Sequence, residues 1–98
     1  MNGVYKIEPA HTAFAVTSAD QVALAANAGR GYCLLQNDSD TDIYISLGVA
    51  AVAHTGILLV AAGGFYEMTP AANNVYPGSI HAIHVGAGNK NLMCLDGN

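Results

Sequence analysis

The chain has 98 residues, of which 52% are hydrophobic and only 10% are charged, and its formal net charge is −4 at pH 7. This length suits one domain. Globular proteins average about 25% charged residues, so this chain must leave part of its surface neutral or apolar. Such surface is typical of contacts between proteins, which favours an oligomer or a component of an assembly. A neutral surface built from Asn, Ser, Thr and Gly is the alternative.

Several partners and locations are disfavoured by the same composition. The three basic residues, Lys6, Arg30 and Lys90, lie far apart in the sequence, so no basic stripe for nucleic acid is visible. No uninterrupted apolar run approaches the ~20 residues of a membrane-spanning helix. The N-terminus lacks the basic-then-apolar pattern of a signal peptide. We therefore expect no nucleic acid, no membrane, and synthesis in the cytoplasm.

The N-terminal segment is interrupted by Pro9, which removes a backbone donor and prevents a continuous strand. We expect residues 1–11 to form an extended arm ahead of a domain at 12–98. Tyr5 and Ile7 flank Lys6 and would supply alternate side chains to a neighbouring subunit, whose sheet edge such an arm can extend. The alternative is an ordinary edge strand that closes the protein's own sheet.

Short apolar segments separated by Gly, Asn and Asp follow, a pattern that is typical of strands. In the first half they lie at 12–17, 21–25, 31–37 and 42–47. One helical turn is the alternative at 21–25. Because successive strand residues point to opposite faces, Cys33 and Leu35 should share one face, and Ile43 and Ile45 should share another.

The second half continues with strands expected at 56–60, 65–69, 79–85 and 91–95. Residues 49–55 are expected to form a loop with one helical turn, and 86–90 a hairpin loop. Seven or eight short strands predict an all-β fold, a single-domain antiparallel β-sandwich that is jelly-roll-like.

The candidate metal ligands are the histidines and the acids of one turn. His81 and His84 have opposite parity in a strand, so they should point to opposite faces. Asp38, Asp40 and Asp42 alternate within one turn, which is either a solvated turn or a calcium site. The Gly and the distal Glu of a helix-loop-helix calcium loop are missing. We expect no metal and no cofactor.

No pattern indicates catalysis. Neither Ser46 nor Ser79 lies in a G-x-S-x-G turn, and the acids are not arranged as an evident catalytic pair. We therefore assign no catalytic residues and expect that the protein is not an enzyme.

Arg30 and Glu67 are candidate interface residues. Arg30 is the only arginine and precedes a central strand, whereas Glu67 lies in an aromatic run. The planar guanidinium binds carboxylates or carbonyls through several hydrogen bonds. The two residues would be paired across the sandwich or a subunit boundary, or each would be solvated at a strand end.

The two cysteines, Cys33 and Cys94, each lie inside an apolar run. Small thiols in such runs are usually buried, and two cysteines do not make a disulfide framework. We expect both thiols to be free, with a disulfide between the two strands as the alternative.

A series of short motifs follows in a fixed order from 27 to 67. Its residues are Asn27, Arg30, Leu35-Gln36-Asn37, Ile43-Tyr44, Leu47-Gly48, Ala51, Gly56-Ile57, Leu59, Gly63-Gly64 and Glu67. This order resembles small structural proteins of tailed-phage virions, the capsid decoration (cement) and head-fibre base proteins. The likeness extends over about residues 12–95, and Ala62 departs from it, because related sequences commonly carry Pro there.

This resemblance implies a structural protein on the capsid surface of a bacteriophage virion. Its partners would be the major capsid protein, whose lattice it would bind and stabilise, and copies of itself. We expect a homotrimer or homodimer, because a sandwich with few charges gains by burying its neutral faces. A component of the collar or tail tip is an alternative within the same class.

The competing function is a carbohydrate- or ligand-binding β-sandwich module. Such a module needs exposed aromatic platforms, and no Trp is present. The available aromatic residues are Tyr32, Tyr44, Tyr66 and Tyr76.

Overall fold

The computed structural model describes residues 9–98, so the expected contacts of Tyr5 and Ile7 lie outside the described residues. This part of the chain forms eight strands and contains no helix that could cross a membrane. The strands are β1 (Ala10–Val16), β2 (Gln21–Leu24), β3 (Tyr32–Asn37), β4 (Ile43–Leu47), β5 (Ile57–Leu59), β6 (Phe65–Met68), β7 (Ile80–His84) and β8 (Lys90–Gly97). The all-β prediction is confirmed.

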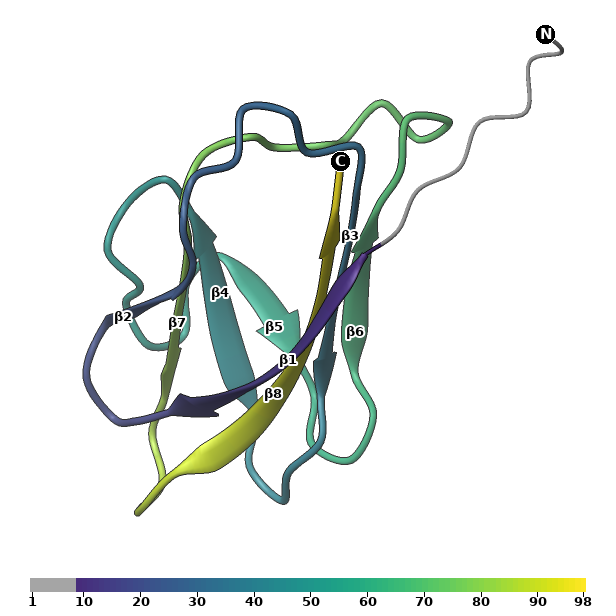
Figure 1. Cartoon of the computed structure of the whole chain (residues 1–98). Coiled ribbons are helices and arrows are strands. Elements are labelled where there is room, and N and C mark those ends of the chain that lie inside the picture. Colours follow the sequence, from purple (N-terminus) through teal and green to yellow (C-terminus); the bar gives the residue numbers. More distant parts are fainter. Residues whose placement is uncertain (1–8) are drawn as a thin grey trace, which may run out of the picture.

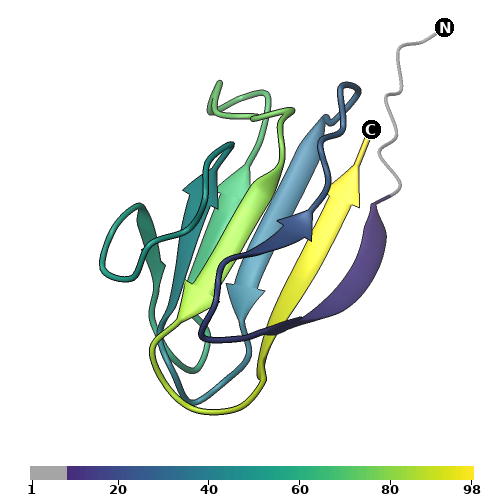
Figure 2. The ribbon, with the colours of Figure 1, turned by 90° about the vertical axis from the view of Figure 1, so that its left-hand side faces the viewer.

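The strands form two four-stranded antiparallel sheets that lie face to face (Figure 1). One sheet has the order β1-β8-β3-β6, and the other has the order β2-β7-β4-β5. This order, with the first strand beside the last and the second beside the seventh, is that of a jelly roll. Figure 2 shows β1, in purple, at the edge of its sheet beside β8, in yellow.

The core lies between the sheets and follows the period-2 pattern of the sequence. Cys33 and Leu35 of β3 are fully buried, as are Ile43 and Ile45 of β4. Each large apolar side chain buried in this way stabilises the fold by about 1.5–3 kcal/mol. The buried hydrophobic cluster consists of Val16, Cys33, Leu35, Ile43, Ile45, Leu59, Met68, Ile80, Ala82, Leu92 and Cys94.

The structure corrects several expected strand ends and one loop. The last strand, expected at 91–95, extends over Lys90–Gly97. β1 begins at Ala10, which pairs with Asp96 of β8, so the last two residues of the expected arm belong to the protein's own sheet. Residues 49–55 contain no helical turn. The positive φ angles of Gly48 (80°), His54 (64°) and Gly56 (82°) break up any right-handed helical path there.

The turn between β5 and β6 has no place for proline at position 62. Ala62 has a φ of 59° and donates its N–H to Ser39 O at 2.8 Å. Proline cannot adopt this φ and has no N–H to donate. The turn of this chain is therefore built differently from a turn that contains Pro before the two glycines.

Candidate interaction surfaces

Arg30 is a buried clamp that joins the two sheets at one end of the sandwich. Its side chain is fully buried, and its Nε donates to Asp96 Oδ1 at 2.7 Å. Its NH2 donates to Asp96 Oδ2 at 3.2 Å, so the carboxylate is bound by two parallel bonds. Further bonds reach the backbone oxygens of Ala25 at 3.0 Å, Tyr76 at 2.6 Å and Gly78 at 3.0 Å.

This geometry corrects both sequence interpretations of Arg30. The residue is neither paired with Glu67 nor solvated at a strand end. Asp96 belongs to β8, whereas Ala25 follows β2 and Gly78 precedes β7 of the opposite sheet. Every nitrogen of the guanidinium donates to a group of the protein itself, so Arg30 is not available to a partner.

Glu67 lies on the outer face of the β1-β8-β3-β6 sheet, opposite Leu34. Its Oε2 accepts a hydrogen bond from the hydroxyl of Tyr32 at 2.7 Å. This bond to the carboxylate raises the pKa of Tyr32 above its ordinary value of 10.0. Unlike Arg30, Glu67 is exposed and remains a candidate interface residue.

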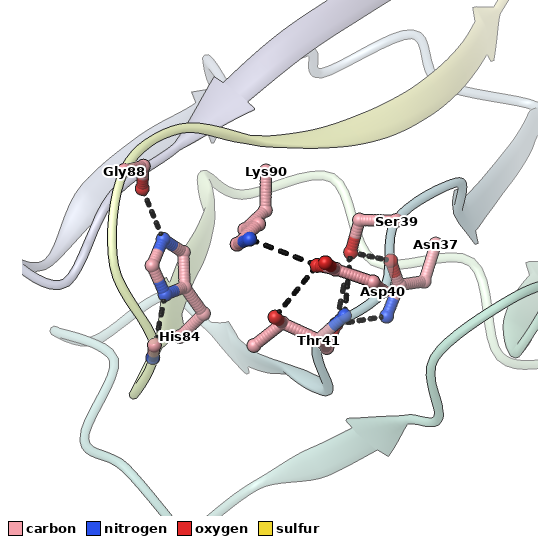
Figure 3. A network of polar contacts seen from close by, with 8 residues as sticks. Asn37, Ser39, Asp40, Thr41, His84, Gly88 and Lys90 are labelled. Atoms are coloured by element: carbon pink, nitrogen blue, oxygen red, sulfur yellow. Dashed lines mark hydrogen bonds and ion pairs between the residues drawn. The ribbon is translucent and has the colours of Figure 1, made fainter.

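The opposite end of the sandwich is held by a polar network around Asn37 (Figure 3). The buried amide of Asn37 donates to Thr41 O at 2.8 Å and to Leu59 O at 2.9 Å, and accepts from Ser39 Oγ at 2.6 Å. One side chain thus shapes the 38–42 loop and fastens it to β5. The Asn-x-Ser sequence at this position has a structural role.

The three acids of the 38–42 loop are directed to three different partners. Asp40 Oδ1 binds Lys90 Nζ at 2.8 Å, and this bond lowers the pKa of Asp40 below its ordinary value of 3.8. Asp38 accepts from Asn91 Nδ2, and Asp42 accepts from the N–H of Ala61. Within residues 9–98 no cluster of three metal-ligating side chains is present.

His81 and His84 point to opposite faces of β7, as their parity predicted. His84 is almost completely buried, and its Nε2 lies 2.7 Å from Gly88 O. The N–H of Gly86 donates to its Nδ1 at 2.9 Å. The imidazole thereby holds the loop that leads from β7 of one sheet to β8 of the other (Figure 3). The hairpin expected at 86–90 is wrong, because β7 and β8 lie in different sheets and do not pair.

Sequence reasoning missed a series of side chains on the other face of β7. Asp20 Oδ1 lies 3.0 Å from His81 Nδ1, and His81 Nε2 lies 3.1 Å from Ser79 Oγ. These are the atom pairs of a Ser-His-Asp triad. The spacing of Ser79 and His81, two residues apart in a strand, was the available signal, because it places both side chains on one face. Asp20 is distant in sequence and gave none.

The surroundings of this series favour a structural role. Acyl transfer also needs N–H donors aimed at the developing oxyanion, each worth 10²- to 10³-fold in rate. The N–H of Ala51 already donates to Asp20 at 2.7 Å, and the N–H of Gly48 donates to Ser79 O at 2.8 Å. The N–H of Ala51, followed by His81, lowers the pKa of Asp20. Both backbone contacts hold the 48–56 loop against this side of the sheet.

Cys33 and Cys94 are free and buried, as predicted. Burial raises the pKa of Cys33 to about 11 and that of Cys94 to about 12. Because the thiolate is the reactive form of cysteine, neither thiol is prepared for nucleophilic chemistry.

The outer face of the β2-β7-β4-β5 sheet is rich in apolar side chains, and its charged neighbour Asp20 is bound to His81 at one side. None of its four strands contains Asp, Glu, Lys or Arg. Val22 and Leu58 lie on this face with exposed fractions of 48% and 49%, and Ile83 lies between their strands. Val60 and Val85, which directly follow β5 and β7, are also exposed.

The outer face of the β1-β8-β3-β6 sheet is hollowed by an open groove of about 460 Å³. Three adjacent strands contribute its walls. Its lining includes His11 and Ala13 of β1, Met93 and Leu95 of β8, and Leu34 and Gln36 of β3. Exposed Phe65 lies beside Gln36 on β6. The groove is therefore mainly apolar, with His11, Thr12 and Gln36 as the polar residues of its lining.

The tyrosines do not assemble a flat sugar-binding platform within the described part of the chain. Tyr44 is buried, and its hydroxyl lies 2.8 Å from His54 Nδ1. Tyr66 and Tyr76 are partly buried and pack against the core. Tyr44 is on the outer side of β4, opposite Leu58, but it is covered, whereas Tyr32 on the outer side of β3 binds Glu67.

Comparisons with protein-family models, with curated proteins and with solved structures found no match to this chain.

Proposed function

We propose that this protein is a structural component of a tailed-phage virion, a decoration or cement protein that binds and stabilises the major capsid protein lattice. The order of motifs from 27 to 67 supports this proposal, because it resembles proteins of that class. The jelly-roll strand order is compatible with it, since capsid domains are among the proteins that use this architecture. A shared fold alone does not assign a function.

The observation that carries the proposal is the neutral outer face of the β2-β7-β4-β5 sheet. Exposed Val22 and Leu58 lie on strands that contain no charged residue. Burying apolar area against a partner is worth roughly 25 cal/mol per Å² before the costs of association. Docking of these strands would desolvate no charged side chain of their own, so the desolvation cost that buried charges carry would not arise from them.

Several charged residues of the described part of the chain serve contacts within the fold. Arg30 binds Asp96, and Lys90 binds Asp40. Asp20 contacts His81 and the 48–56 loop. Because these groups stabilise the fold itself, neutral faces are left for assembly. Self-association into a closed dimer or trimer is part of the proposal, because virion shells offer twofold and threefold positions.

Quantitative mass spectrometry of purified particles tests the proposal. The particles are grown from the phage genome that encodes this chain, and its copies are counted relative to the major capsid protein. We expect a fixed ratio of the same order as the capsid protein. A few copies per particle would indicate a collar or tail-tip component, and absence from the particles would overturn the proposal.

A further inference from the structure

We infer that the groove on the outer face of the β1-β8-β3-β6 sheet receives residues 1–8 of a second copy of this chain, in a reciprocal pair. This inference deepens the proposed function and rests on the self-assembly that it includes. It names the occupant of the groove and the contact that holds two copies together.

The groove has the size and chemistry to receive two side chains of an extended peptide. Its volume of about 460 Å³ spans β1, β8 and β3, and apolar Leu34, Met93 and Leu95 line it. The small side chain of Ala13 leaves room on the β1 side. Apolar side chains that entered this space would gain by leaving water.

Residues 1–8 have the matching pattern. Tyr5 and Ile7 are two apart, so in an extended segment they point to the same side and can enter one groove together. A segment of eight residues reaches about 26–29 Å when extended. The groove takes in only residues 11–13 of β1, so the segment is long enough to bring Tyr5 and Ile7 to it from a second copy.

The rim and walls of the groove offer polar partners to such a segment. Gln36 Nε2 donates to Gly63 O at 3.1 Å, and its carbonyl oxygen accepts no hydrogen bond within residues 9–98. That oxygen can accept an N–H from a bound backbone. Glu67, opposite Leu34, carries negative charge at the rim, and Lys6 of the segment carries the opposite charge.

The position where the described chain begins favours exchange between two copies. Ala10 is already paired with Asp96, and Pro9 has a fixed φ. A chain that turned back into its own groove would need at least two further residues for the reversal. Those residues would be 7 and 8, so Ile7 could not lie in the groove. In a twofold pair the two segments can cross without reversing, and the arrangement closes.

Four variants of the full chain test this inference by native mass spectrometry and light scattering. The segment variant carries Tyr5→Ser with Ile7→Ser, and the groove variant carries Ala13→Trp, which fills the groove. The matched controls are Val4→Ser, which faces the other side of the segment, and Ala87→Trp in the exposed β7–β8 loop. We expect wild type and both controls to be dimers, and the segment and groove variants to dimerise at least tenfold more weakly.

Mixing the two weakened variants provides a complementation test. The segment variant keeps an intact groove, and the groove variant keeps an intact segment. Together they can form one of the two exchanged contacts, so with one partner isotope-labelled we expect a heterodimer that exceeds either homodimer. A monomeric wild type, or variants that dimerise as strongly as wild type, would overturn the inference.

Disulfide trapping covers the case in which Ala13→Trp does not fold. A chain with Tyr5→Cys and Met93→Cys is oxidised at low concentration, while Cys33 and Cys94 remain buried. Exchange predicts a covalent dimer, whereas a bond within one chain, or none, would contradict it. The particle count is a separate readout, so a protein absent from virions that still forms this dimer would overturn the proposed function alone.

Discussion

The β2-β7-β4-β5 sheet contains no Asp, Glu, Lys or Arg on any strand, whereas the β1-β8-β3-β6 sheet carries Glu67, Lys90 and Asp96. The first sheet presents a neutral face with exposed Val22 and Leu58. The second presents a groove with Glu67 beside it. A neutral face suits a broad, shape-matched contact with a lattice, and a groove suits an extended segment. The difference indicates that one small sandwich can make two kinds of contact.

The largest effect is expected at the clamp that holds these two sheets together. Arg30→Ala leaves Asp96 without its cation and three backbone oxygens without their donor. Breaking a buried pair in this way costs about 3–5 kcal/mol, a large part of the 5–15 kcal/mol that stabilises an ordinary domain. Urea unfolding measures the loss. Arg30→Lys keeps the charge but not the fork, and should recover only part of the stability.

The turn that connects the two sheets through Ala62 should show an intermediate effect. Ala62→Pro removes the N–H that binds Ser39 O and cannot adopt the φ of 59°. We expect a loss of about 2–3 kcal/mol. Ala62→Gly relieves the left-handed strain and should stabilise by up to about 1 kcal/mol. Thermal unfolding of Ala62→Pro and Ala62→Gly measures both effects. Equal melting temperatures for the two variants would contradict the positive φ and the N–H bond of Ala62.

Substitutions on the two outer faces should change assembly and leave the stability of the fold nearly unchanged. Leu58→Glu on the neutral face and Phe65→Glu near the groove both replace exposed side chains, so the free energy of unfolding should change by less than about 0.5 kcal/mol. Leu58→Glu should reduce the copies found in purified particles severalfold. Ala71→Glu, in an exposed loop, is the control and should assemble normally. If Leu58→Glu and Ala71→Glu are incorporated into particles equally, the neutral face does not contact the capsid.

The smallest effect concerns the exposed acids at the edges of the sheets. The bond to Lys90 lowers the pKa of Asp40, and the N–H of Ala51 lowers that of Asp20. A carboxyl whose pKa is depressed on folding stabilises the fold above its unfolded pKa, and this contribution is lost as the pH falls through the folded value. The urea midpoint should therefore decrease modestly below about pH 4. The urea midpoint of Asp40→Asn should decrease less at acidic pH than that of the wild type. If the two proteins lose the same amount, the contact of Asp40 with Lys90 does not stabilise the fold.

The fold class was predictable because buried and exposed residues alternate within each strand, and this pattern can be read from the sequence of one strand alone. The burial of Cys33, Leu35, Ile43 and Ile45 follows directly from the period of two. The start of β1 was not predictable in this way, because the pairing of Ala10 with Asp96 joins opposite ends of the chain. The missing helical turn at 49–55 depends on positive φ angles, which Ala-rich composition does not reveal.

The interface candidates were predicted less well, for a reason that Arg30 illustrates. Its partner is Asp96, because the strand order places β8 beside β3. Glu67 was chosen from its setting in the sequence, yet its pairing with Leu34 directs it outward. Residue types identified the chemistry of the guanidinium, but only the strand order identified the acid that it binds. The series of Asp20, His81 and Ser79 was missed for the same reason.

Side-chain oxidation footprinting in assembled particles tests the neutral face most directly. Rates of modification at Val22 and Leu58 are compared between the free protein and purified virions, with exposed Pro70 and Pro77 of the 70–78 loop as reference positions. We predict that Val22 and Leu58 become severalfold less reactive in the particle while both prolines react at unchanged rates. Protection of the prolines with Val22 and Leu58 still reactive would contradict the assignment of this face to the capsid contact.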